Sequence, residues 1–189
     1  MERPSSASSA GTAHRIGRRD WPWLFAYPAY QIIGTIRHEG AHALAVWLEG
    51  GRVTKFVFWP TWEGRFYWGY LSWSGRADWL VSAAPYLADL ATFAAFFLVC
   101  TRLRLRRHRV WVNLYAIGLA SPFVNSAYRY ASSFFRSGDL TPVMKAVPPA
   151  VVHAYFILSL AAYAAALASI QFRRARPPEG GQPPRPAGS

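Results

Sequence analysis

Cysteine is almost missing from this chain, since Cys100 is the only one among 189 residues. A single thiol excludes an intrachain disulfide, so no disulfide framework holds the fold together. Acidic residues are also scarce, with 9 Asp and Glu against 21 Lys and Arg. The first twenty residues lack an apolar run and therefore do not have the pattern of a cleavable signal peptide. What remains is a basic chain whose middle is close to continuously apolar.

The net charge of +12 could suggest a nucleic-acid-binding protein. The arginines, however, lie at the ends of apolar runs and not along one face of an amphipathic helix. That placement is typical of the cytoplasmic flanks of membrane proteins. We therefore expect the lipid bilayer as a partner, and no nucleic acid.

Four apolar segments are long enough to cross a bilayer as helices. They cover residues 21–48, 79–100, 111–135 and 150–170. Residues 52–73, between the first two, are rich in Val, Phe, Tyr and Trp, and Glu63-Gly64 in their middle suits a hairpin turn. The expected fold class is an all-α membrane protein with about four transmembrane helices and a short interfacial β-hairpin after the first helix.

The two ends of the chain differ in composition from this middle. Residues 1–19 predict a disordered basic tail and residues 173–189 a disordered Pro/Gly-rich tail. Residues 20–172 are the expected membrane-embedded domain, in which residues 136–149 form a loop or a re-entrant turn. Most arginines then fall on the side of both termini. The positive-inside rule therefore predicts a multi-pass protein, placed in the bacterial plasma membrane, with both termini cytoplasmic.

The first apolar segment contains an H-E-x-x-H motif, His38-Glu39-Gly40-Ala41-His42. Residues four apart share one face of a helix, so His38 and His42 can bind one metal ion from the same side. Imidazole nitrogen suits Zn²⁺, and a catalytic zinc uses three protein ligands and a water molecule. Glu39 lies beside the first histidine and can accept a proton from that water. The motif predicts a zinc site with Glu39 as the catalytic base.

A reading without metal is also open. Charges within lipid are costly, so Glu39 would then pair with Arg37 or Arg129, and the histidines would make polar contacts between helices. With a metal, Arg37, Asn125 and Arg129 are expected to line the route by which water reaches the site.

The third zinc ligand has three candidates. Asp139 follows the third apolar segment, Asp89 lies within the second, and His153 lies near the start of the fourth. Asp89 could equally be a structural polar residue facing Asn113 or Asn125. His153 could equally be an interfacial histidine. The spacing leaves these alternatives open.

At these residues the chain resembles the site-2 protease family of intramembrane zinc metalloproteases. The resemblance rests on the motif at 38–42, the helix that continues through 43–48, and the Gly-Gly-Arg-Val step at 50–53. Residues 83–88 resemble the small-residue helix that comes next in that family. Residues 137–140 resemble a degenerate form of the later motif whose aspartate is the third zinc ligand. The resemblance therefore implies that Asp139 completes the site.

The chain departs from the family pattern in three ways. The usual Asn-Pro run before the aspartate is absent, Leu140 replaces a glycine, and there is no PDZ-like insertion. What the resemblance implies is a zinc-dependent intramembrane endopeptidase that hydrolyses peptide bonds of transmembrane or membrane-associated proteins. Residues 52–73 are expected to hold an unwound substrate segment by strand addition.

Two other functions stay open. The degenerate aspartate motif would suit a catalytically inactive membrane protein with a structural or regulatory metal site. A small transporter could instead use His38 and His42 to carry metal ions or protons. The sequence does not specify the oligomeric state.

Overall fold

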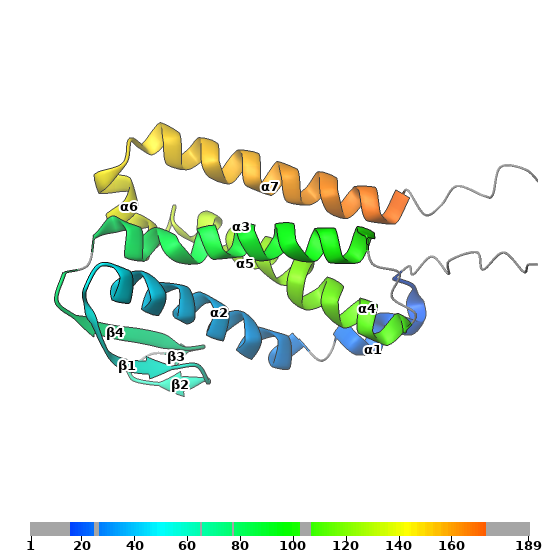
Figure 1. Ribbon diagram of the computed structural model, residues 1–189, viewed down its shortest axis with the longest axis horizontal. Helices are drawn as coiled ribbons and strands as arrows, with labels where there is room; N and C mark the ends of the chain where they lie inside the picture. The colour runs from blue at the N-terminus through cyan, green and yellow to red at the C-terminus, as the bar shows by residue number, and fades with distance from the viewer. Residues whose placement is uncertain (1–15, 25–26, 65, 77, 103–106, 173–189) are drawn as a thin grey trace, which may run out of the picture.

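Long helices running roughly along one axis dominate the fold (Figure 1). The computed structural model describes residues 16–24, 27–64, 66–76, 78–102 and 107–172. The α-helices are α1 (Trp21–Leu24), α2 (Tyr27–Leu48), α3 (Trp79–Arg102), α4 (His108–Tyr115), α5 (Ser121–Ser132), α6 (Leu140–Ala146) and α7 (Pro149–Phe172). The strands are β1 (Arg52–Val57), β2 (Thr61–Trp62), β3 (Phe66–Tyr67) and β4 (Tyr70–Ser74). The fold is therefore mostly helical, with small antiparallel sheets of two strands each.

Two helices have the length and composition of a membrane span. α3 and α7 each contain 24 residues and are long and apolar enough to cross a bilayer; within the described part of the chain they alone meet both criteria. Their bounds coincide to within two residues with the predicted segments 79–100 and 150–170. α2 is also long, but its second half carries Arg37, His38 and Glu39, which reduce its apolar content.

The other segments differ from the predictions in detail. The first divides into α1 and α2, on either side of residues 25–26, which lie outside the described part. The third is α4, a π-helical turn over Ala116–Ala120, and α5 in direct succession. The expected loop at 136–149 contains α6, so that expectation was incomplete. Pro142 is tolerated there because it lies in the first turn of the helix, and Leu140 and Val143 bury one face.

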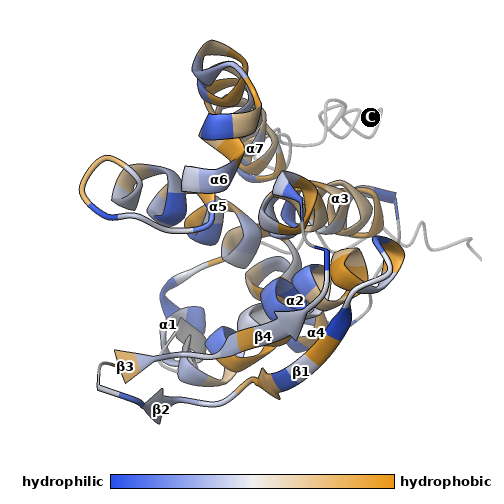
Figure 2. Cartoon of the chain, turned by 90° about the vertical axis from the view of Figure 1, so that its left-hand side faces the viewer, coloured by the Kyte–Doolittle hydropathy of each residue, from blue (hydrophilic) through white to orange (hydrophobic). Residues whose placement is uncertain are grey.

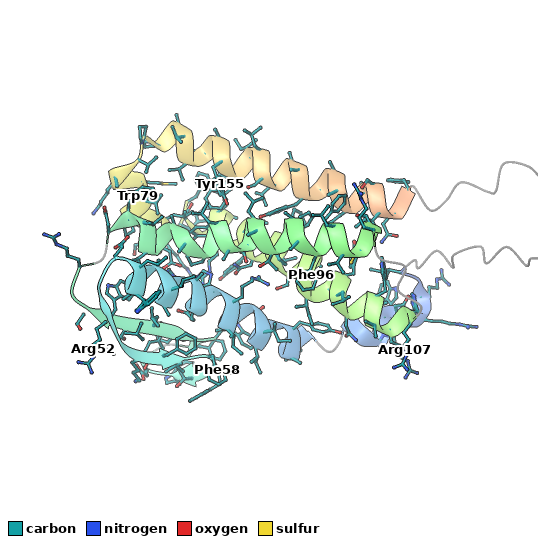
Figure 3. All side chains as sticks on the ribbon, viewed as in Figure 1. Arg52, Phe58, Trp79, Phe96, Arg107 and Tyr155 are labelled. Atoms are coloured by element: carbon teal, nitrogen blue, oxygen red, sulfur yellow. The ribbon has the colours of Figure 1, made fainter. Side chains whose placement is uncertain are left out.

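α3 is the central helix, since it packs against α2, α5 and α7. The largest apolar cluster surrounds Phe93, Trp111 and Tyr163, which come from α3, α4 and α7. α3 approaches the π-helical turn so closely that a Cβ at Gly118 would overlap the side chain of Phe96 (Figure 3). Only a residue without a side chain allows this contact.

Replacing Gly118 with alanine should destabilise the protein by about 1–3 kcal/mol, because the added methyl overpacks a filled interface. Thermal unfolding in detergent would measure the loss as a lower Tm. Gly40→Ala is the matched control, since Gly40 is also helical and a Cβ there meets no heavy atom within 4 Å. An unchanged Tm for Gly118→Ala would contradict the close approach of the two helices.

A nested hairpin follows α2. β1 pairs with β4, and β2 pairs with β3 nearer the tip. Gly64 turns the chain there with a φ of 71°, a conformation that glycine adopts without strain. Glu63 accepts hydrogen bonds from Lys55 Nζ at 2.9 Å and from the Tyr70 hydroxyl at 2.6 Å, which tie the tip to both long strands. The predicted hairpin with its turn at Glu63-Gly64 is confirmed.

The hairpin lies alongside α2 and does not extend away from it (Figure 2). Gly69 packs so closely against Thr35 that a Cβ at position 69 would overlap the Thr35 methyl. Farther along, Trp73 of β4 stacks on His42, so β4 passes beside the half of α2 that carries the H-E-x-x-H motif. Near the tip, Trp59, Trp62 and Phe66 remain exposed.

The two ends of the described chain lie at the same end of the molecule (Figure 1). At the opposite end lie the end of β4, the start of α3, and α6 (Figure 1). Residues 1–15 and 173–189, which hold almost all of the two predicted tails, lie outside the described residues. Residues 16–19 lead into a 3₁₀ turn (Arg18–Asp20), where Asp20 Oδ1 lies 2.8 Å from His108 Nε2.

Candidate metal centre

The second half of α2 places His38 and His42 side by side, as their spacing predicted. Both side chains are buried, and their ring centroids lie 5.0 Å apart with an interplanar angle of 86°. Two imidazoles one helical turn apart thus face the same interior space.

Asp139 reaches these histidines from the loop between α5 and α6. Its Oδ2 lies 3.2 Å from His38 Nε2 and 3.8 Å from His42 Nε2. One ligand atom from each of the three residues falls within 4.8 Å of the others. Ligands about 2.0–2.1 Å from a tetrahedral ion are separated by roughly 3.3 Å, and the two separations that involve Asp139 Oδ2, 3.2 and 3.8 Å, lie near that value. The three side chains could therefore hold a metal ion.

Hydrogen bonds fix which histidine nitrogen is free for a metal. His42 Nδ1 donates to the Val81 carbonyl at 2.7 Å, which leaves the lone pair of Nε2 directed toward Asp139. Trp73 of β4 stacks on the same imidazole, with centroids 6.4 Å apart and an angle of 21°. His38 also turns its Nε2 toward Asp139, while its buried Nδ1 has no hydrogen-bond partner among the described residues. Both Nε2 atoms are thus presented to the same point.

Glu39 is buried next to this group, with 6% of its surface exposed. The charges of His42, Asp139 and Arg129 all act on its carboxyl group. Glu39 therefore lies within electrostatic range of His42 and Asp139.

Arg129, on α5, is the cation beside this group. Its Nη1 lies 3.6 Å from Asp139 Oδ2, and its side chain is 38% exposed. Burial raises the pKa of Asp139, but the polar contacts with His38 and His42 outweigh burial, so this pKa lies below its usual range. Asp139 is thus ionised at neutral pH, as a metal ligand must be.

Asp89, the second candidate ligand, belongs to a separate polar network. It is fully buried, and its Oδ1 accepts a hydrogen bond from Arg37 Nε at 2.8 Å. Its Oδ2 accepts from Asn125 Nδ2 at 2.7 Å and from Ser126 Oγ at 3.3 Å. The Arg37 guanidinium also donates to the Ile117 carbonyl in the π-helical turn. Asp89 is therefore a structural polar residue that faces Asn125. Arg37 and Asn125, which were expected to line a route for water, bind Asp89 instead.

His153, the third candidate ligand, also lies apart from the metal group. Its Nδ1 lies 2.9 Å from the Tyr130 hydroxyl, and its ring stacks on Phe134. The group that the structure brings together is therefore His38, His42 and Asp139, with Glu39 adjacent.

Sequence reasoning missed a cleft of about 410 Å³ whose lining includes Trp73, the residue that stacks on His42. It is lined by Trp73, Asp78, Trp79, Ser82, Pro142, Lys145 and Ala146. Trp79 marks its place at the start of α3, close to α6 (Figure 3). Three segments that are separate in the sequence form this cleft, so no local sequence pattern predicts it. The Val81 carbonyl was missed for a similar reason, because a backbone acceptor leaves no trace in the sequence.

The geometry defines a class of site: two histidines and a carboxylate, largely buried, spaced to hold one metal ion, with a glutamate alongside. Comparisons of the chain with family models, with curated proteins and with solved structures give no match. Any assignment of function must therefore come from the residues and their arrangement.

Proposed function

We propose that this protein is a zinc-dependent intramembrane endopeptidase of the site-2 protease type. One observation carries the proposal. Asp139 lies 101 residues after His38 in the sequence, yet it meets His38 and His42 at a spacing that could hold a metal ion, beside the buried Glu39. An H-E-x-x-H motif that arose by chance would not be expected to find a distant carboxylate at this distance.

The long helices and their outward-facing side chains support a membrane location. α3 and α7 have the length of membrane spans. α2 lies beside α3, and so do α4, the π-helical turn and α5, which follow one another directly. Large apolar side chains face outward from these helices, among them Leu44, Leu87, Leu98, Ile157 and Leu158. Lipid is the solvent in which such a surface is stable. We infer four spans in the bacterial plasma membrane, with both termini cytoplasmic according to the positive-inside rule.

The residues around the metal have complementary roles in hydrolysis. A zinc ion held by the three ligands would polarise a peptide carbonyl and make a water molecule acidic enough to lose a proton near neutral pH. Glu39 accepts that proton at a carboxylate oxygen and returns it to the nitrogen of the leaving amine. The Val81 carbonyl holds the His42 ring in place through Nδ1 during this exchange.

A substrate helix must unwind before its backbone can be attacked, because its carbonyls are hydrogen-bonded within the helix. β4 pairs with β1 on one side, and its other edge has no strand partner in the described part of the chain. Trp73 on this strand contacts the metal ligand His42. An extended substrate segment added to that edge would thus lie near Glu39.

The proposal is tested by comparing membrane-protein fragments in proteoliposomes. Purified protein is mixed with a membrane extract, and peptides are identified by mass spectrometry with zinc, after chelation, and after zinc is restored. We expect fragments cut within transmembrane segments that vanish on chelation and return with zinc. Bound zinc without such fragments would mean an inactive metal site. Zinc flux into the vesicles without cleavage would mean a transporter. Either outcome overturns the proposal.

A further inference from the structure

Arg129 lies on the metal side of Asp139, where a purely metal-binding site would not place a cation. Its Nη1 is 3.6 Å from Asp139 Oδ2, the same oxygen that faces both histidines. A positive charge this close to a metal ligand repels a divalent cation and lowers its affinity. If the site served only to hold the ion, replacing Arg129 with a neutral residue would improve it.

The buried arginine on α2 provides a contrast. Arg37 is 13% exposed and binds Asp89, the Ile117 carbonyl and the Ser121 hydroxyl, so its N–H groups are directed at structural partners. Within the described part of the chain, the Arg129 guanidinium makes one longer contact, with the Asp139 carboxylate, and its side chain is 38% exposed. Guanidinium N–H donors on Arg129 therefore remain available for a molecule that enters the site.

Peptide hydrolysis creates negative charge that such donors can stabilise. Water adds to the carbonyl carbon, Glu39 takes one of its protons, and the carbonyl oxygen becomes negatively charged. An electron pair on that oxygen then re-forms the C=O bond as the C–N bond breaks, and the proton passes from Glu39 to the leaving nitrogen, which gives a carboxylic acid and an amine. No other reactant is needed. A preorganised donor aimed at that oxygen lowers the barrier, because it binds the transition state more strongly than the substrate.

We propose that Arg129 is a catalytic residue that donates a hydrogen bond from its guanidinium group to the carbonyl oxygen of the scissile peptide as negative charge develops on it. This role rests on the proposed function. It explains why an arginine, always protonated, lies beside a metal ligand at some cost in metal affinity.

The test uses Arg129→Gln and Arg129→Lys, with Arg136→Gln as a matched control. Arg136 is exposed, lies just beyond the end of α5, and loses the same charge in that variant. The substrate is a peptide containing a transmembrane segment found to be cut in the zinc and chelator comparison. Turnover is measured in detergent, and zinc affinity is measured separately with zinc alone.

We expect Arg129→Gln to lower kcat by roughly 100- to 1000-fold with little change in KM, as loss of one oxyanion donor does. Its zinc affinity should rise by roughly three- to tenfold, since the repulsion is removed. Arg129→Lys should recover part of kcat, and Arg136→Gln should match the wild type in both measurements.

Three results would overturn this role. In the first, Arg129→Gln turns over at the wild-type rate. In the second, its zinc affinity falls in step with its activity, which marks a structural ion pair with Asp139. Both leave the peptidase proposal intact. In the third, the wild-type protein loaded with zinc cuts no membrane peptide, and both proposals fail together.

Discussion

Replacing Glu39 with glutamine is expected to reduce peptide hydrolysis by at least about 1000-fold while zinc stays bound. Glutamine keeps the shape of the side chain but has no carboxylate to accept a proton. The metal ligands are untouched, because the group with ligand spacing is formed by His38, His42 and Asp139. Cleavage of a transmembrane peptide and zinc content per protein molecule, measured on the same preparation, separate these two effects.

Glu49→Gln is the matched control for this experiment. Glu49 follows the last residue of α2, and its Oε2 accepts a hydrogen bond from the backbone N–H of Asp78 at 2.7 Å. Glutamine has a carbonyl oxygen that can still accept that bond, so Glu49→Gln should cleave at the wild-type rate. Substantial cleavage by Glu39→Gln would exclude the role of Glu39 as the base.

Replacing His42 with alanine should weaken zinc binding by at least roughly 100-fold, since even the loss of an outer hydrogen-bond partner costs 10- to 100-fold. Competition with a chromophoric chelator would measure the affinity. His153→Ala is the matched control, because His153 pairs with Tyr130 away from the metal group and should leave the affinity unchanged.

Asp139→Ala should weaken zinc binding as strongly as His42→Ala does. Here the result decides the third ligand, which the sequence left open among Asp139, Asp89 and His153. Unchanged zinc affinity in Asp139→Ala would show that a different group completes the coordination of the metal. The contacts of Asp139 with His38 at 3.2 Å and with His42 at 3.8 Å would then be ion pairs only.

The long elements could be predicted because their signals are local. α3 and α7 follow from runs of apolar residues, and the hairpin turn follows from Glu63-Gly64 between two aromatic-rich stretches. The juxtaposition of His38 and His42 follows from helical periodicity alone. Each of these predictions needs only residues near one another in the sequence.

The remaining parts depend on contacts between distant segments. Asp139 reaches His38 only after three helices have packed, so the spacing alone could not select it over Asp89. Asp89 has a different partner, Arg37, in a pair of buried charges that no periodicity reveals. α6 was missed because Pro142 suggested a break, although proline is compatible with the first turn of a helix.

α1 and the C-terminal end of α7 lie at one end of the molecule, and α6 with the start of α3, which contribute to the cleft, lie at the other (Figure 1). In the topology proposed above, a fluorescent protein fused to either terminus would lie on one side of the bilayer, and the cleft lined by Trp73 would open to the other. With cytoplasmic termini, a chelator that does not cross membranes could remove zinc from the protein in intact spheroplasts. The products released from the cleft would accumulate outside the cytosol.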